Sequence, residues 1–235
     1  MTESFGSLFV VGTPIGNLSD MSERCINTLK QADIIACEDT RTSGNLMKQF
    51  NIQAKLTSFH QHNEHRKVQD IINLLKTGKN VALISDAGMP AISDPGFLLT
   101  REAHKNGIAV VPIPGPNAAV TALAASGLPS DRFIFEGFLP QKKGRKTRMM
   151  NLKEETRTLV FYESPYRVVR FLKELEEHFG PERLAVIARE LTKKFEEIKR
   201  GTLSELKQDF ENRPSIKGEF VIIVAGNGYT EEASP

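Results

Sequence analysis

Short apolar runs alternate with longer amphipathic stretches through the first half of the chain. Continuous apolar runs predict buried parallel strands, whereas apolar residues spaced three and four apart predict helices. The expected strands are 7–11, 33–37, 80–84 and 108–111. The expected helices are 21–31, 43–50, 65–76, 97–106 and 117–126. This repeated strand–helix order predicts a parallel sheet covered by helices on both faces.

The pattern changes after residues 127–131, which have the composition of a linker. Strands are expected at 133–137, 158–162, 184–188 and 218–225, and a further strand, which turns back along the sheet, is expected to end at residue 201. One helix is expected to end at residue 178 and another to cover 203–212. Strands that follow one another closely predict a mixed sheet. The sequence therefore predicts an α/β protein with two α/β domains: an N-terminal domain, 1–126, with a mostly parallel sheet, and a C-terminal domain, 127–235, with a mixed sheet.

Composition narrows the class of protein only a little. The chain has 235 residues and a net charge of +2, which is too small by itself to indicate a nucleic-acid partner. Its two cysteines, Cys25 and Cys37, and an N-terminus without a secretory pattern lead us to expect a reducing cytoplasm. No apolar run approaches the roughly 18 residues that a membrane span needs. We therefore expect no membrane association.

Three loops rich in glycine and proline follow expected strands, at 12–20, 85–96 and 112–118. In open α/β sheets, ligands bind just beyond the carboxyl ends of the strands, so these loops are candidate ligand loops. The alternative for 85–96 is a turn in which Asp94 caps the following helix. The glycine spacing after residue 11 does not fit the dinucleotide-binding fingerprint. Asp20 and Glu23 have the spacing of a capping box for the first helix.

Acidic and basic residues also cluster directly after the second expected strand, at 38–42. Asp39 and Arg41 are the candidate site residues of this cluster. The alternative is that Asp39 caps the next helix and Arg41 forms a surface ion pair. Three of the five histidines, His60, His62 and His65, lie close together, but no second pair of ligands accompanies them. We therefore expect no metal.

A basic cluster lies beyond the strand expected at 133–137. Cations at the start of a helix oppose its dipole, so their density here indicates a partner rich in phosphate. The alternative is a solvated helix start. The candidate RNA-binding residues are Lys142, Lys143, Arg145, Lys146 and Arg148.

Eight motifs occur in order at 11–20, 38–42, 59–64, 85–96, 114–118, 162–167, 189–193 and 218–221. Together they resemble the ribosomal RNA small-subunit methyltransferase I family, which belongs to the tetrapyrrole-methylase-like, class III S-adenosylmethionine methyltransferases. The resemblance extends from about residue 7 to residue 226. The tetrapyrrole branch has G-x-G-P-G-D and G-G-D-P loops, which this chain lacks.

The resemblance implies 2′-O-methylation of a cytidine ribose in the decoding region of 16S ribosomal RNA, within the small subunit. It also implies a homodimer, and S-adenosylmethionine, converted to S-adenosylhomocysteine, as the cofactor bound between the two domains. By motif position, the implied cofactor contacts are Pro14, Ser85, Asp86, Met89, Asn117, Ala118 and Glu163.

A ribose hydroxyl is a poor nucleophile, so a proton acceptor or an electrostatic stabiliser would assist methyl transfer. The candidates are Asp39 as acceptor, with Arg41 as a phosphate or ribose clamp, and Glu190 with Lys193 as an alternative pair. His60 or His62 could also carry the proton. Two other functions stay open: a small-molecule methylase of the tetrapyrrole branch, and a non-catalytic RNA-binding ribosome assembly factor.

Overall fold

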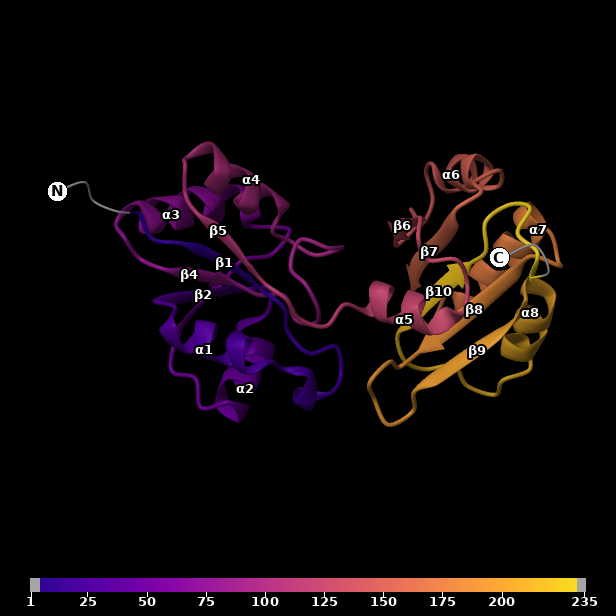
Figure 1. The fold of residues 1–235 in the computed structure, drawn as a ribbon, viewed down its shortest axis with the longest axis horizontal. Helices are drawn as coiled ribbons and strands as arrows, with labels where there is room; N and C mark the ends of the chain where they lie inside the picture. The colour runs from indigo at the N-terminus through magenta and orange to yellow at the C-terminus, as the bar shows by residue number, and fades with distance from the viewer. Residues whose placement is uncertain (1–4, 232–235) are drawn as a thin grey trace. The chain divides into compact units, whose positions relative to one another are not determined.

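The computed structural model describes residues 5–231 and contains two compact units, Met1–Asn117 and Ala118–Pro235 (Figure 1). Each unit holds one five-stranded sheet with helices around it. The predicted class of two α/β domains is confirmed. The division comes earlier in the chain than residue 126, because helix α5 (Ala118–Ser126) packs on strands of the second unit.

The N-terminal sheet is entirely parallel, with the strand order β3-β2-β4-β1-β5. Its strands are β1 (Leu8–Val11), β2 (Ile34–Cys37), β3 (Lys55–Ser58), β4 (Val81–Leu83) and β5 (Val110–Ile113). Strand β3 was not predicted from the sequence. It lies at the edge of the sheet and its four residues are exposed or half-buried, so they do not form an apolar run.

Helices cover both faces of this sheet, as predicted (Figure 1). On one face lie α1 (Glu23–Gln31) and α2 (Thr40–Gln49), and on the other lie α3 (Glu64–Lys76) and α4 (Phe97–Lys105). The chain leaves β1 toward the first face and the neighbouring β4 toward the second. Such a reversal opens a crevice at the carboxyl ends of the two strands.

The starts of α1 and α2 show how local sequence sets helix boundaries. The expected capping box of Asp20 and Glu23 is wrong, since Asp20 ends a 3₁₀ helix, η1 (Leu18–Asp20), and Ser22 caps α1 by accepting from the Cys25 amide. Asp39 caps α2 by accepting from the Arg41 amide, which is the alternative considered for it. A serine and an aspartate are both preferred N-cap residues.

The C-terminal sheet is mixed, as predicted, with the strand order β6-β7-β10-β8-β9. Strands β6 (Phe133–Gly137) and β7 (Thr158–Glu163) are parallel, and the remaining neighbours are antiparallel. The remaining strands are β8 (Leu184–Arg189), β9 (Glu197–Thr202) and β10 (Phe220–Val224). All five residues of the central β10 are buried, as its continuous apolar sequence predicts.

Three helices pack around one hydrophobic core of this unit: α6 (Arg145–Leu152), α7 (Val168–Phe179) and α8 (Leu203–Glu211). Met149 and Leu152 are the apolar residues by which α6 joins that core. Helix α7 contributes five buried side chains, among them Phe171, whose ring meets Phe161 edge-to-face at 5.3 Å. The polar faces of α6 and α7 are therefore oriented away from the sheet.

Candidate functional site

Three loops meet at the carboxyl end of the N-terminal sheet. The β1 loop and the β4 loop form a backbone bridge, in which the Thr13 amide donates to Gly88 O at 2.9 Å and the Gly88 amide donates to Thr13 O at 3.1 Å. The buried Thr13 hydroxyl donates to Ser85 O at 3.1 Å. These bonds hold Ser85 and its neighbours at the switch point between β1 and β4.

The β5 loop touches the β1 loop directly. A Cβ atom on Gly12 would lie 2.6 Å from the Gly115 Cα and 2.8 Å from the Met89 sulfur. Only glycine allows two backbones to approach this closely. Met89 and the loops that begin at Gly12 and Gly115 are therefore packed together, and Pro14 and Asn117 lie on the same two loops.

Backbone strain concentrates in two of the loops singled out from the sequence. Five non-glycine residues among 5–231 have positive φ, and four of them lie in these loops. Ala91 and Ser93, at φ 68° and 64°, belong to the β4 loop, and Glu190 and Thr192, at 51° and 67°, follow β8. Strain of about 1–3 kcal/mol per residue persists only where the surroundings enforce it, and it is common at functional sites.

Asp86 links the β4 loop to the β2 loop. Its Oδ1 accepts a hydrogen bond from the Asp39 amide at 3.2 Å. Asp86 itself is exposed, whereas the neighbouring Ser85 is buried with its hydroxyl donating to Gly88 O at 3.3 Å. The carboxylate of Asp86 thus stands in solvent at the carboxyl end of the sheet and is held there by the backbone of a neighbouring loop.

Two of the carboxylates at this edge, Glu38 and Asp94, have raised pKa values. Burial raises the pKa of Asp94 to about 6, opposed by a hydrogen bond from Ser85 and assisted by Glu38 and Asp86. Burial also raises the pKa of Glu38, again assisted by Asp86. Asp94 does not cap α4, since the residue at that position is Gly96 and no side-chain cap bond is made. The edge carries a negative potential that a cationic ligand would relieve.

Asp94→Asn is expected to stabilise the protein at neutral pH. Because the folded-state pKa of about 6 lies above the ordinary 3.8, the stabilising contribution of Asp94 is complete below about pH 4 and is lost as the pH rises through 6. With allowance for solvent screening, the free energy of unfolding of the variant should exceed that of the wild type by about 1–2 kcal/mol at neutral pH. Urea unfolding at about pH 4 and pH 7 measures this difference.

The control for this experiment is Asp131→Asn, an exposed acid of the second unit. It measures the effect of removing one exposed carboxylate. If Asp94→Asn raised the free energy of unfolding as much at pH 4 as at pH 7, the raised pKa of Asp94 would be contradicted.

Asp39 and Arg41 form a fork-like ion pair at the start of α2. The Arg41 guanidinium donates through Nε to Asp39 Oδ1 at 3.2 Å and through Nη2 to Oδ2 at 2.8 Å. These bonds, with that from the Arg41 amide, hold the pKa of Asp39 at about 2. Arg41 is 89% exposed. While it is paired with Arg41, Asp39 is a weak base.

His60 begins the loop after β3, next to the acidic edge. Its Nδ1 is buried without a hydrogen-bond partner among residues 5–231, and its Nε2 lies 3.1 Å from the side-chain Nδ2 of Asn63. The His60 and His62 rings lie 6.0 Å apart, edge-to-face. Among residues 5–231 no group of three or more His, Cys, Asp or Glu side chains is arranged to hold a metal ion.

Glu190 and Lys193 lie after β8, in the second unit. The Lys193 ammonium donates to Glu190 Oε1 at 3.0 Å and to Glu219 Oε2 at 2.9 Å. Although burial opposes both shifts, these bonds raise the pKa of Lys193 and lower that of Glu190. A Cβ atom on Gly218, at φ 100°, would lie 2.4 Å from the Glu190 side chain, so Gly218 leaves the room that Glu190 occupies. Lys193 is thus a cation held in place by the carboxylates of Glu190 and Glu219.

The two remaining cofactor candidates also belong to the second unit. Glu163 is 3% exposed, and its Oε1 accepts from the Ser164 amide at 2.8 Å and from Arg167 Nε at 2.7 Å. Ala118 is half-buried at the start of α5. The backbone amide of the next residue, Ala119, donates to the Tyr162 hydroxyl at 3.2 Å. Glu163, the last residue of β7, is thus held by the segment that leads into α7.

The basic cluster divides into two kinds of side chain. Arg145 is 7% exposed and Arg148 is about half exposed, and each is paired with an acid, Glu174 at 2.6 Å and Glu136 at 2.5 Å respectively. In contrast, Lys142, Lys143 and Lys146 are exposed, and none of the three has an ion-pair partner within residues 5–231. Arg145 therefore differs from the expectation, since its guanidinium cannot reach a phosphate without leaving Glu174.

The partners of these arginines were not predicted from the sequence. Glu174 lies on α7, 29 residues after Arg145, and Glu136 lies on β6, 12 residues before Arg148, so these pairs depend on how the elements pack. A weak signal existed in the spacing of Arg170 and Glu174, which is that of a helical ion pair.

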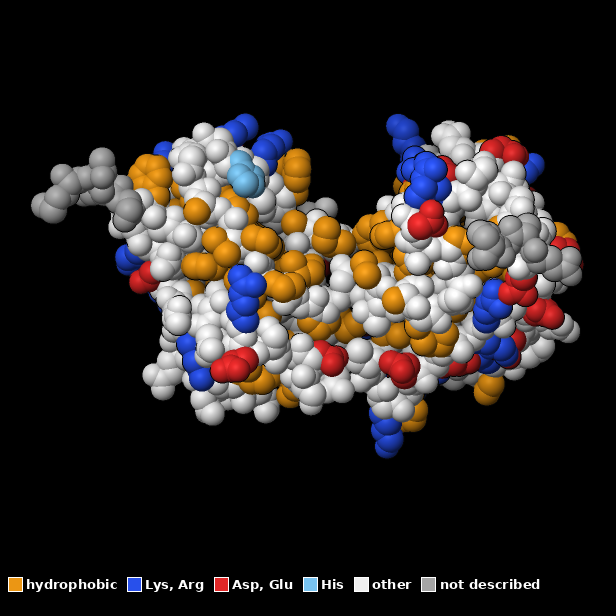
Figure 2. All heavy atoms as spheres, viewed as in Figure 1, with side chains coloured by type: hydrophobic (Ala, Val, Ile, Leu, Met, Phe, Trp, Pro, Cys, Tyr) orange, Lys and Arg blue, Asp and Glu red, His pale blue; other side chains and the backbone are white. Residues whose placement is uncertain are grey.

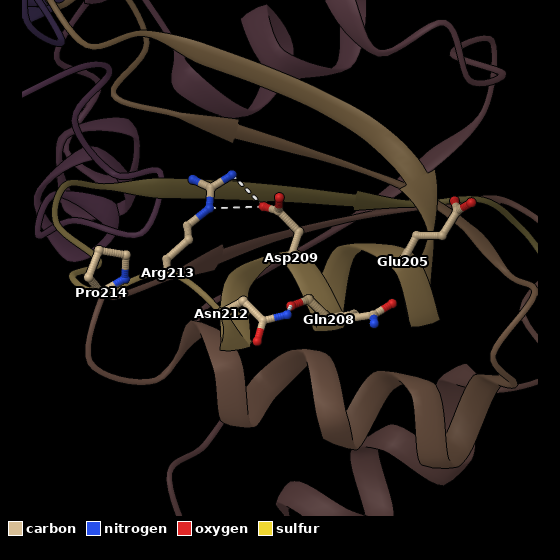
Figure 3. A pocket seen from close by; sticks show the side chains of 6 residues that line it. All are labelled: Glu205, Gln208, Asp209, Asn212, Arg213 and Pro214. Atoms are coloured by element: carbon tan, nitrogen blue, oxygen red, sulfur yellow. Dashed lines mark hydrogen bonds and ion pairs between the residues drawn. The ribbon is translucent and has the colours of Figure 1, made fainter.

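A hollow of about 470 Å³ lies at the end of α8, lined by Glu205, Gln208, Asp209, Asn212, Arg213 and Pro214 (Figure 3). The figure shows Arg213 pointing toward Asp209, with which it pairs at 2.5 Å, and it also pairs with Glu197 at 2.6 Å. Because both acids already hold this guanidinium, we assign no ligand to the hollow.

Comparison with known proteins gives consistent matches. Residues 7–207 match the family described as Tetrapyrrole (Corrin/Porphyrin) Methylases. A protein of Haemophilus influenzae named ribosomal RNA small subunit methyltransferase I is 48% identical, over 100% of this chain and 85% of its own length. A protein of the same name from Pseudomonas aeruginosa is 51% identical, over 95% of this chain and 80% of its own length.

Two solved structures share the fold. One is a cobalamin biosynthetic enzyme, cobalt precorrin-4 methyltransferase, with a TM-score of 0.67 and 17% identity over 93% of this chain and 94% of its own. The other is uroporphyrin-III-C-methyltransferase from Thermus thermophilus, with a TM-score of 0.62 and 20% identity over 94% of both chains. In this chain, no helix within residues 5–231 has the length and apolar character that a bilayer crossing requires.

Proposed function

Since the chain belongs to the ribosomal RNA small subunit methyltransferase I family, within the tetrapyrrole methylases, we propose that it transfers a methyl group from S-adenosylmethionine to a cytidine 2′-hydroxyl in the decoding region of 16S ribosomal RNA. The observation that carries this proposal is identity of about half of all positions along nearly the full chain with relatives of that name. We propose further that it acts as a homodimer, in the cytoplasm, on the small ribosomal subunit.

The residues of the first unit fit a cofactor of this chemistry. S-adenosylmethionine supplies an electrophilic methyl group on a sulfonium, and because the ammonium and carboxylate of its amino-acid end cancel, its net charge is positive. Glu38, Asp86 and Asp94 supply negative charge at the carboxyl end of the N-terminal sheet, and a bound cation would offset the burial and the repulsion that raise the pKa values of Glu38 and Asp94. Backbone groups of the loops that hold Pro14, Met89 and Asn117 would contact its neutral parts. The carboxylate of Asp86, exposed and fixed by the Asp39 amide, is the best placed of these groups.

Asp39 and Arg41 are proposed to act together on the RNA. Arg41 is exposed, so its guanidinium can transfer from Asp39 to an RNA phosphate, which is a partner of matching geometry. When the Arg41 guanidinium leaves, Asp39 loses the side-chain bonds that contribute most to its low pKa, keeps the bond from the Arg41 amide and becomes a stronger base. Binding of RNA would then prepare the group that accepts the 2′-hydroxyl proton.

Glu190 and Lys193 are the alternative pair for the same reaction. Lys193 stays charged and is fixed by Glu190 and Glu219, so it suits stabilisation of a developing alkoxide better than acceptance of a proton. Ala118 and Glu163 stay proposed cofactor contacts of the second unit. Glu163 would have to bind through Oε2, which lies 3.9 Å from Arg145 Nη2, because Oε1 already accepts two bonds.

The basic cluster is proposed to bind the RNA backbone. Lys142, Lys143 and Lys146 are the members that are free to meet phosphates, while Arg145 and Arg148 hold α6 in place through Glu174 and Glu136. Contacts of this kind position an RNA without reading its bases.

One experiment tests the proposed function. The protein is incubated with methyl-labelled S-adenosylmethionine and small ribosomal subunits that lack the modification, and the label is then mapped in the RNA. We expect label on a single ribose of the decoding region. Label on a base, or none on RNA but transfer to a porphyrinoid offered in parallel, would refute the proposal. Absence of both transfer and cofactor binding would indicate a non-catalytic RNA-binding protein.

A further inference from the structure

A groove lies between α6 and α7 of the second unit, with a volume of about 450 Å³. Five cationic side chains line it and two acids join them, Glu174 and Glu177. The cations come from three segments: Lys142 from the loop before α6, Arg145 and Lys146 from α6, and Arg167 and Arg170 from the start of α7. Figure 2 shows Lys and Arg side chains gathered near α6.

The groove rests on an ionic network centred on the buried Arg145. Arg145 donates to Glu174 Oε2 through Nε at 2.7 Å and to Pro140 O at 3.2 Å, and it lies over the Phe171 ring at 5.2 Å. Glu174 also pairs with Arg170 at 2.9 Å. An arginine that is buried and bonded in this way fixes the distance between α6 and α7. The groove is thus part of the packed structure and does not depend on surface side chains alone.

The charge that is left over is positive. Glu174 is shared by Arg145 and Arg170, and Arg167 pairs with the buried Glu163. Lys142 and Lys146 have no acidic partner within residues 5–231, and Arg170 is 70% exposed beside its single pair. Cations that lack compensation at the first turn of a helix raise the local potential further, because they oppose the helix dipole.

We propose that this groove binds the phosphodiester backbone of RNA, with the α7 arginines Arg167 and Arg170 forming the wall that faces Lys142 and Lys146. The inference rests on the proposed function for the identity of the nucleic acid. It adds the α7 wall to the candidate RNA contacts, and it assigns Arg145 to the floor as a positioning residue. Mobile lysines on one wall and fork-shaped arginines on the other are suited to successive phosphates.

Tyr166 supports an extended RNA over a free phosphate ion. It directly precedes the groove-lining Arg167 and is 95% exposed, the most exposed of the large hydrophobic side chains within residues 5–231. Single-stranded bases stack on exposed aromatic rings, with about 1–3 kcal/mol for each base, and Tyr166 offers such a ring one residue from the groove.

The test measures RNA affinity by fluorescence anisotropy, with a labelled single-stranded RNA at several salt concentrations. The double variant Lys142→Gln, Lys146→Gln removes two charges that make no ion pair, so folding should be unaffected. We expect affinity at about 0.15 M salt to fall about tenfold, and the slope of log affinity against log salt to flatten by about 0.7 for each contact. Arg170→Gln should act in the same direction, and Tyr166→Ala should lower affinity without changing the slope.

Lys173→Gln is the matched control. Lys173 lies on α7 but pairs with Glu211 and does not line the groove, so its replacement should leave the slope unchanged. Wild-type affinity and slope in the double variant would overturn the proposal. Binding of S-adenosylmethionine by the same variants, measured by calorimetry, should stay at the wild-type value. If the wild-type protein methylates RNA and the groove variants bind RNA as tightly as wild type, only the groove proposal fails. If the wild-type protein transfers no methyl group to RNA, the proposed function itself is refuted.

Discussion

Asp39→Asn is expected to lower the single-turnover rate of methyl transfer by about 100-fold, the lower range for loss of a general base. An asparagine is also a good N-cap, so the bond from the Arg41 amide and the start of α2 should be kept. The substitution removes the negative charge of Asp39, which is freed from its ion pair with Arg41 when RNA binds. Cofactor affinity should change little. Rapid-quench measurements with saturating enzyme and labelled cofactor give the rate directly.

Asp39→Ala is the companion variant for the same residue. It removes both the carboxylate and the cap, so it should lower the rate equally and also lower the free energy of unfolding by about 0.5–2 kcal/mol. If Asp39→Asn transfers methyl groups at the wild-type rate while Asp39→Ala loses only stability, Asp39 is a helix cap and nothing more. The Glu190 and Lys193 pair would then be the remaining candidate, and Lys193→Met would be expected to lower the rate of methyl transfer.

Asp86→Asn is expected to weaken binding of S-adenosylmethionine by about 10- to 100-fold, because a hydrogen bond to a charged group contributes roughly 1.5–3 kcal/mol. The asparagine oxygen can still accept from the Asp39 amide, so the link between the β4 and β2 loops should persist. The affinity loss therefore reports the charge at the crevice. Isothermal titration with the cofactor measures it without any RNA, and the cationic cofactor should be affected more than its product, which lacks the sulfonium charge.

A matched control exists within the same sheet. Asp33 directly precedes β2, and its Oδ2 accepts from the Asn80 amide at 2.8 Å, so it makes the same kind of bond at the opposite end of the strand. Asp33→Asn should leave cofactor affinity at the wild-type value. Equal losses in both variants would show that the effect comes from general loss of acidic charge and would contradict a specific role for Asp86.

The lengths of most helices and strands followed from local sequence. The run Val68, Ile71, Ile72 and Leu75 predicts α3, and these four side chains are buried in the structure. The continuous apolar sequence of β10 predicts a central buried strand, which it is. Strand β3 was missed because an edge strand with exposed and half-buried residues has no apolar run to detect.

The candidate loops could be predicted for a similar reason. Glycine and proline restrict the backbone locally, so the loops at 12–20, 85–96 and 112–118 are visible in the sequence, and the order of strands places them at one edge of the sheet. The closeness of Gly12 and Gly115 and the positive φ of Ala91 and Ser93 could not be predicted, because they depend on how the loops pack on one another.

The sequence by itself determined the two α/β domains, the loops at the strand ends and the presence of five cations before and within α6, because each is a property of neighbouring residues. Only the tertiary structure decided which charges are free. Arg145 became part of the packing and Lys146 stayed exposed because α7 places Glu174 against the first and not the second. Likewise, Asp94 acquired a pKa of about 6 because folding buries it beside Ser85 and close to Glu38 and Asp86. Burial and the pairing of distant charges depend on contacts between elements, and local sequence does not contain them.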